Sequence, residues 1–232
     1  MSSGFFSFFA HTGMLAALRA TGFTPAHVAG SSAGGLVAGM WAAGIEPDGL
    51  AHTLGELRRA QFWDPAPGAG LLAGRRFDAM LRELLPVTAI EDCRVPVRIS
   101  VFDIASRRTK VVDRGDLATA IRASCAVPIM FHPVWIDQRP CWDGGILDRP
   151  GIAGVPDGER LLFHHISAKS PWRTSLALPR RAGMVTLVID RLPRSGPFRL
   201  DAGREALARA RVATERALDT RISDDGVVRV SA

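Results

Sequence analysis

The chain has 232 residues, of which 47% are hydrophobic and 22% are charged. This balance excludes a disordered or fibrous chain and is typical of an ordinary globular protein. A chain of this length can bury a sizeable core without disulfides or metal, so we expect a single domain over residues 1–232.

The formal net charge is +6, and nearly all of the positive charge is arginine, with lysine only at Lys110 and Lys169. Much of this charge lies between Arg173 and Arg221. Such a basic face either is a solvated surface with interspersed Asp and Glu or holds a protein at an anionic membrane. No nucleic-acid motif accompanies the charge, so nucleic acid is not an expected partner.

The longest apolar stretch, residues 35–45, is shorter than the ~20 residues that span a bilayer. The first twenty residues do not follow the pattern of a secretory signal. Cys93, Cys125 and Cys141 match no metal-ligand spacing and no disulfide framework. We therefore expect free thiols, no metal or cofactor, and a cytoplasmic protein that can contact a membrane peripherally.

The sequence of the first half of the chain predicts helices before and after one extended segment. Residues 12–21 predict a short helix that Gly22 ends. Next come an extended segment at 26–29, a glycine turn and a helix over 33–43, which gives the order strand, sharp turn, helix. Further helices are predicted over 47–60 and 76–85, separated by a Pro- and Gly-rich loop at 64–71.

The second half mixes apolar strands with helices. The predicted elements are strands at 95–104 and 109–113, a helix at 116–124, a hairpin made by PVWID and CWDGG, strands at 161–166 and 184–189, and a weakly amphipathic helix at 201–219. Helices interleaved with apolar strands predict a layered α/β fold.

The stretch VAGSSAGG contains a candidate nucleophile. Gly30, Ser32 and Gly34 satisfy G-x-S-x-G between the predicted strand and helix, where a strained turn projects a serine hydroxyl and needs small neighbours. Ser31 lacks a glycine two residues before it, so Ser32 is the candidate. The alternative is a serine that merely caps a helix; a phosphate loop is discounted because no Gly-Lys-Ser/Thr follows.

A serine hydroxyl needs a base to accept its proton. Asp143 in CWDGG follows a predicted strand, and the two glycines after it would let the carboxylate reach another loop. The alternative for Asp143 is a simple Asp-Gly turn. His164 and His165 follow later, so a Ser, Asp, His triad is the rival arrangement, although adjacent residues of a strand face opposite sides.

Three runs in this order, AGSSAGGLVAGMWAAG, RASCAVPIMFHPV and WDGGILDRP, resemble the patatin-like phospholipase family. The segment PVRISVFDIASRRTKVVDRGDLATAIRASCAVP is similar to that family's central section, and the resemblance extends from His11 to about Pro150. It implies a three-layer α/β/α fold with a mostly parallel central sheet. It also implies a Ser/Asp dyad that hydrolyses acyl esters of lipids, with Ser32 as nucleophile and Asp143 as general base.

The chain departs from the family at the front. The family usually has a strand and then a glycine-rich loop with Arg or Lys, whose backbone amides form the oxyanion hole. Here SGFFSFFAHTGML offers only Gly4, and the first basic residue is Arg19. The resemblance then implies an oxyanion hole made by backbone amides of Gly4, Phe5, Phe6 and Ala33.

Losing one oxyanion donor costs on the order of a hundredfold to a thousandfold in turnover. Either the activity is weak or the start codon lies upstream. The alternative function is thus a catalytically weakened protein of this fold that binds lipid or membrane surfaces. The segment's four phenylalanines, Phe5, Phe6, Phe8 and Phe9, either line an apolar pocket or, as Phe more often does, pack in the core.

Overall fold

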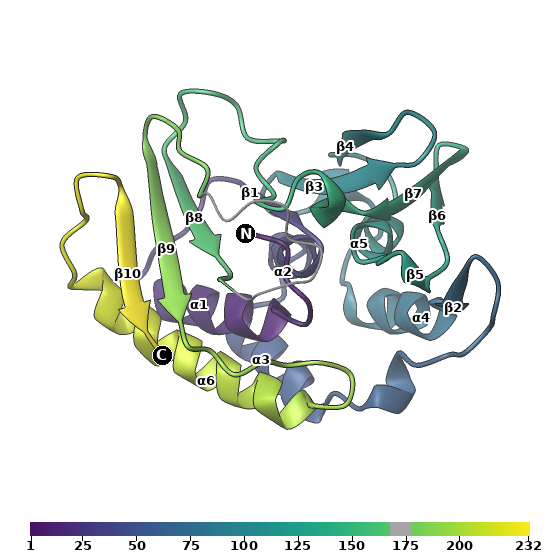
Figure 1. Ribbon diagram of the computed structural model, residues 1–232, viewed down its shortest axis with the longest axis horizontal. Coiled ribbons are helices and arrows are strands. Elements are labelled where there is room, and N and C mark those ends of the chain that lie inside the picture. Colours follow the sequence, from purple (N-terminus) through teal and green to yellow (C-terminus); the bar gives the residue numbers. More distant parts are fainter. Residues whose placement is uncertain (168–177) are drawn as a thin grey trace.

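Strands and helices are interspersed along the chain, and the strands form two main sheets with helices packed around them (Figure 1). The structure is a computed structural model that describes residues 1–167 and 178–232. Lys169, and Arg173 at the start of the predicted basic segment, lie outside these ranges.

The larger sheet has five strands, in the order β1-β3-β7-β6, with β4 also paired to β3. Their bounds are β1 Val28–Ser31, β3 Val97–Asp103, β4 Arg108–Val112, β6 Val134–Ile136 and β7 Arg139–Asp143. β1 runs parallel to β3, whereas β4 and β7 run antiparallel to β3. β6 and β7 form the antiparallel hairpin that the sequence predicts.

The second sheet consists of β8 (Leu161–His165), β9 (Met184–Asp190) and β10 (Val227–Ser231), all parallel. Residues 1–2 lie between the two sheets: the Met1 nitrogen donates to the Ala29 carbonyl of β1 at 2.8 Å, and the Ser2 amide donates to the His164 carbonyl of β8 at 3.2 Å. The predicted α/β class with flanking helices is confirmed, but a mostly parallel sheet is confirmed only in part.

The helices cover both sheets. They are α1 Phe8–Ala20, α2 Ala33–Ala42, α3 Pro47–Glu56, α4 Arg75–Leu84, α5 Leu117–Ser124 and α6 Leu200–Leu218, with the short 3-10 helices η1 Arg59–Gln61, η2 Ile90–Asp92 and η3 Gly144–Ile146. In Figure 1, α1 and α6 lie side by side against the three-stranded sheet. α2 and α5 pack against β3 of the larger sheet.

The α1 helix contributes to two groups of buried apolar side chains. Phe9 and Leu15 join the cluster around α2, β3 and α5, whereas Met14 and Leu18 join the cluster around β9 and α6. A helix that is apolar on all sides is stable only when it is enclosed. α1 is therefore a central element, and the segment before it, residues 1–7, is buried or partly buried except at Phe5.

Several predicted boundaries differ from the structure. α1 begins four residues earlier than predicted, because Phe8 to His11 continue the helix that starts after Ser7. The sequence patterns missed three strands, β10, β2 (Gly70–Leu72) and β5 (Ile129–Phe131). β2 and β5 pair with each other and have three residues each, too few for a two-residue periodicity to be visible.

Two further observations concern the described residues. Within 1–167 and 178–232, no helix is both long and apolar enough to cross a membrane. In the same ranges no three His, Cys, Asp or Glu side chains gather as metal ligands would. Cys93, Cys125 and Cys141 are all free thiols, as predicted.

Candidate active site

The G-x-S-x-G segment forms the predicted strand, sharp turn and helix. β1 ends at Ser31, α2 begins at Ala33, and Ser32 between them has φ 54° and ψ −124°. A residue with a side chain rarely adopts a positive φ, and such strain concentrates at functional sites. The turn holds the Ser32 side chain in one fixed direction.

The two outer glycines are required by close backbone contacts. A Cβ atom on Gly30 would lie 2.4 Å from the carbonyl carbon of Gly34. A Cβ atom on Gly34 would lie 2.2 Å from the Met1 carbonyl oxygen. Any side chain at position 30 or 34 would clash with these backbone atoms, which explains why glycine occupies both positions of the motif.

The structure brings Ser32 and Asp143 together. The Ser32 hydroxyl donates to Asp143 Oδ2 at 2.6 Å, and both side chains are buried. The sheet accounts for this contact, because β1 and β7 both pair with β3: Ser31 is opposite Ser100, and Asp143 is opposite the next residue, Val101. The carboxyl end of β1 and the carboxyl end of β7 therefore meet at the same place on β3.

The environment of Asp143 makes its carboxylate more basic than usual. Burial raises its pKa from 3.8 to about 6, while hydrogen bonds from Ser32 and from the Gly145 amide oppose this shift. The Gly145 amide donates to Oδ1 at 2.7 Å and leaves Oδ2 for the serine. A carboxylate with such a pKa is mostly ionised at pH 7 and accepts a proton more readily than an exposed aspartate.

Ser124 is a site residue that sequence reasoning did not single out. The Ser32 amide donates to the Ser124 hydroxyl at 2.8 Å, and that hydroxyl donates to the Ser100 carbonyl at 2.7 Å. The contact connects the strained turn to α5 and β3 and removes the Ser32 amide from the possible oxyanion donors. Ser124 lies in RASCAVP, one of the quoted runs, but no local pattern indicates which backbone group it would bind.

Asp148, also not singled out, anchors the segment that follows Asp143. Its carboxylate is buried and accepts a hydrogen bond from the Ser100 hydroxyl at 2.6 Å. The same carboxylate accepts bonds from the amides of Gly151, Ile152 and Ala153. The loop after β7 is thereby attached to β3, which is the strand that also positions Asp143.

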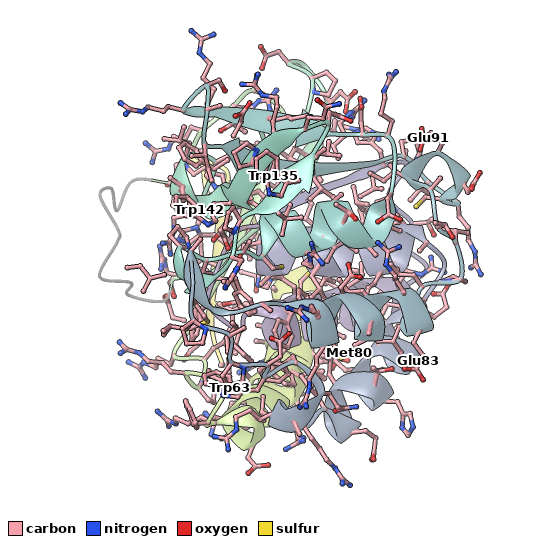
Figure 2. All side chains as sticks on the ribbon, turned by 90° about the vertical axis from the view of Figure 1, so that its right-hand side faces the viewer. Trp63, Met80, Glu83, Glu91, Trp135 and Trp142 are labelled. Atoms are coloured by element: carbon pink, nitrogen blue, oxygen red, sulfur yellow. The ribbon has the colours of Figure 1, made fainter. Side chains whose placement is uncertain are left out.

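An apolar cleft of about 100 Å³ lies beside Ser32. The residues predicted for the oxyanion hole, Gly4, Phe5, Phe6 and Ala33, all line it. α4 contributes Met80, which Figure 2 shows on the side of the molecule that carries this helix. The lining is almost entirely aliphatic and aromatic, so the cleft suits a hydrocarbon chain.

The phenylalanines at the front divide between the two predicted roles. Phe9 is fully buried in the core, where Phe is most often found. Phe5, Phe6 and Phe8 line the cleft, and Phe6 and Phe8 also pack against the main core, so core packing and cleft lining both apply to these two side chains. Phe6 has a φ of 55°, a second strained position beside the cleft.

The rival groups lie in less suitable places. Ser31 is fully buried and does not line the cleft. His164 Nδ1 forms a hydrogen bond with His11 Nδ1 at 2.9 Å, and within the described part of the chain no histidine lines the cleft. Cys125 does line it, but burial, reinforced by Asp143, raises the pKa of its thiol well above the usual value, so the reactive thiolate is suppressed.

Comparisons with known proteins find a matching family model and several related sequences. The family model described as patatin-like phospholipase matches residues 1–155, a range that contains both Ser32 and Asp143. Uncharacterized NTE family proteins of Mycobacterium tuberculosis and Mycobacterium bovis are 36% identical over 154 residues, which is 63% of this chain and 42% of theirs. The chain thus spans less than half the length of these relatives.

Two more distant proteins are also similar. Lysophospholipase NTE1 of Mycosarcoma maydis is 28% identical over 165 residues, which is 66% of this chain and 9% of that protein. The crystal structure of VipD from Legionella pneumophila aligns with a TM-score of 0.44 at 16% identity, covering 81% of this chain and 48% of that one.

Proposed function

The chain belongs to the patatin-like phospholipase family, and from this premise we propose that it is a serine acyl hydrolase that cleaves carboxylic ester bonds of phospholipids or other lipids. The observation that carries the proposal is the 2.6 Å hydrogen bond from the Ser32 hydroxyl to Asp143 beside an apolar cleft. A nucleophile within hydrogen-bond reach of its base is the arrangement that covalent acyl transfer requires.

In the proposed first step, Ser32 Oγ attacks the ester carbonyl carbon while its proton passes to Asp143 Oδ2. The tetrahedral intermediate collapses, the bond to the alcohol oxygen breaks, and Asp143 returns the proton to the departing alcohol. A water molecule then attacks the acyl-enzyme, with Asp143 again accepting a proton. The fatty acid leaves and the Ser32 hydroxyl is restored.

The oxyanion would be held by backbone amides at the start of α2 and in the turn over Gly4 to Phe6. The α2 helix begins at Ala33, and the N-terminal end of a helix favours negative charge. The Ser32 amide is already bonded to Ser124, so in this proposal the Ala33 amide is the donor from the α2 side.

Single substitutions test the dyad. We expect Ser32→Ala and Asp143→Asn each to lower hydrolysis of a short p-nitrophenyl ester by at least about a thousandfold, as the loss of a nucleophile or its base does. Ser31→Ala is the matched control, because this neighbouring serine does not line the cleft, and it should keep nearly full activity.

A fluorophosphonate probe provides a second measurement. It should label the wild-type protein at Ser32 and should not label Ser32→Ala, since the reaction needs an activated hydroxyl. Full activity in either dyad variant would overturn the proposed roles. Absence of both labelling and hydrolysis in the wild-type protein would favour the alternative of a lipid-binding protein without catalysis.

A further inference from the structure

A group of arginine and aromatic side chains lies next to the residues that line the cleft. Phe198 is 69% exposed, and its ring is 5.4 Å from that of Trp63, centroid to centroid. The Arg59 guanidinium lies over the Phe198 ring at 4.7 Å and over the Trp63 ring at 5.9 Å. Arg59 therefore forms cation–π contacts with two rings that are not enclosed in the core.

This group is continuous with the wall of the cleft. Phe62, adjacent to Trp63, lines the cleft and contacts Phe6 at 5.7 Å between ring centroids. The segment before Phe198 touches the same wall, because the Ser195 hydroxyl donates to the Phe6 carbonyl at 2.9 Å. Phe5, which is 50% exposed, also lines the cleft, so its ring reaches from the interior to the surface.

Arg76 adds a second cation to the same place. Its guanidinium donates to the carbonyls of Ala60 and Trp63, at 2.8 and 3.3 Å, from the start of α4. Figure 2 shows Trp63 on the same side of the molecule as Met80, one of the α4 residues that line the cleft. We call Phe5, Arg59, Trp63, Arg76 and Phe198 the arginine–aromatic rim.

The two arginines of the rim outnumber the one carboxylate that adjoins Trp63 in the chain, so the rim keeps a net positive charge. Within residues 1–167 and 178–232, neither Arg59 nor Arg76 forms an ion pair with an acidic side chain. The acidic residue next to Trp63 is Asp64, and its carboxylate accepts hydrogen bonds from the amides of Gly74, Arg75 and Arg76. Two cations and exposed rings thus remain available at the rim.

We propose that the arginine–aromatic rim is the surface by which the protein docks on a lipid layer containing anionic phospholipid. Aromatic rings and arginines are the side chains that settle at the boundary between headgroups and acyl chains, and anionic headgroups attract clustered cations. Docking in this way places the mouth of the cleft against the lipid. The acyl chain can then enter the apolar cleft while the charged headgroup stays with the arginines.

The proposal differs from the expectation that the basic segment near the C-terminus forms the membrane contact. Phe198 precedes α6 and Arg221 follows it, and this helix of 19 residues is about 28 Å long. Docking through the rim and docking through the end of α6 therefore predict different sensitive residues. The docking proposal rests on the proposed function only where it describes how the acyl chain enters the cleft. Docking itself is measured by vesicle binding, which needs no turnover.

Vesicle co-sedimentation tests the rim. Wild-type protein should bind vesicles of phosphatidylglycerol and phosphatidylcholine more tightly than vesicles of phosphatidylcholine alone, and added salt should weaken the binding. Arg59→Gln should lower the partition coefficient about fivefold, the factor that one basic residue contributes near an anionic surface. Arg59→Gln combined with Phe198→Ala should lower it by at least about tenfold.

Matched substitutions at the far ends of α1 and α6 serve as controls. The control variant changes Phe23, which follows α1 and is 43% exposed, in place of Phe198. It changes Arg221, which follows α6, in place of Arg59. Phe23→Ala with Arg221→Gln should leave vesicle binding within about twofold of wild type. Because the changed side chains are exposed, the thermal unfolding midpoint should be unaffected in both double variants, which excludes misfolding as the cause.

Hydrolysis of a short soluble ester separates this proposal from the proposed function. Neither Arg59 nor Phe198 lines the cleft, so the rim variant should keep its rate on that ester. If the wild-type protein binds vesicles but has no esterase activity, and the rim variant no longer binds, the docking proposal is supported and the proposed hydrolase function is refuted. Vesicle binding that is equal in the rim and control variants, or absent in the wild type, would overturn the docking proposal.

Discussion

Ser32 and Asp143 form a short hydrogen bond in a place where water is largely excluded, and this determines how the proposed site should respond to pH. Ionised Asp143 is the form that can accept the serine proton. Burial disfavours that form and raises the pKa of the carboxyl to about 6. The pH at which activity appears is therefore a direct measure of the desolvation of this carboxylate.

We expect kcat/KM for a neutral ester to rise about tenfold per pH unit below pH 6 and to level off above it. The sign follows because the raised pKa leaves Asp143 protonated and inactive at low pH, and kcat/KM reports the free enzyme. A pH profile between 4.5 and 8 measures it. A kcat/KM that is still level at pH 4.5, as for an aspartate with the ordinary pKa of 3.8, would contradict the buried environment of Asp143.

At the scale of elements, the strand, turn and helix around Ser32 depend on two glycines for their packing. The chain contains other glycines that have no such role. Gly49, inside α3, has no atom within 4 Å of the place where its Cβ would be, whereas the corresponding position on Gly30 lies 2.4 Å from the backbone of Gly34. The same substitution should therefore have opposite effects at the two sites.

Gly30→Ala should destabilise the protein by roughly 3 kcal/mol or more, because backbone rather than a flexible side chain must move. Gly49→Ala should stabilise it by about 0.5–1 kcal/mol, since alanine loses less chain entropy in a helix than glycine does. Urea unfolding at neutral pH measures both free energies. Equal effects at the two positions would show that the close contact at the turn is not rigid.

Across the whole molecule, α1 and β8 are joined by a buried pair of histidines. His11 Nε2 donates to the Ser2 carbonyl at 2.8 Å, so in the neutral ring His11 Nδ1 accepts from His164 Nδ1 at 2.9 Å. His164 Nε2 is buried and has no hydrogen-bond partner among the described residues. Desolvation lowers the pKa of both rings, that of His164 to about 3.

The free energy of unfolding should fall as the pH is lowered from 6.5 to 5. The unfolded chain binds protons at both histidines near pH 6.5 while the folded protein does not, a difference of up to ~1.4 kcal/mol per pH unit for each ring. Asp143 acts in the opposite direction, because its raised pKa makes the folded protein bind a proton first. Burial lowers the pKa of the Met1 amino group from 8.0 to about 5, so this group acts in the same direction as the histidines. The net loss should be about 2 kcal/mol per pH unit.

Urea unfolding at pH 7.0, 6.0 and 5.3 tests this balance, and His52→Gln is the control because His52 is exposed. The slope of stability against pH should be the same in this variant. A stability that stays constant or rises toward pH 5.3 would mean that the two buried rings are not held neutral.

The longer elements were predictable because their residues repeat with a clear period. The bounds of α2, α4, α5, β3 and β4 fall within two residues of those expected from the sequence. The short strands β2 and β5 were missed because three residues carry no period and β2 begins within the Pro- and Gly-rich segment 64–71, which was predicted to be a loop. Their existence depends on the pairing of Gly70 with Ile129 across the fold.

Two properties of this protein follow from the sequence alone: the order of most helices and strands, and the identity of the serine and the carboxylate that could act together. The order of the elements rests on apolar periodicity, and the candidates Ser32 and Asp143 rest on the small residues around them together with the resemblance to the patatin-like phospholipase family, which implies their pairing. Only the tertiary structure decided that β1 and β7 share β3, that Ser124 binds the Ser32 amide, and that Phe5, Phe6 and Phe8 line a cleft. Strand partners and cleft walls come from residues far apart in the chain, and their register is set by burial of the whole core, which no local pattern encodes.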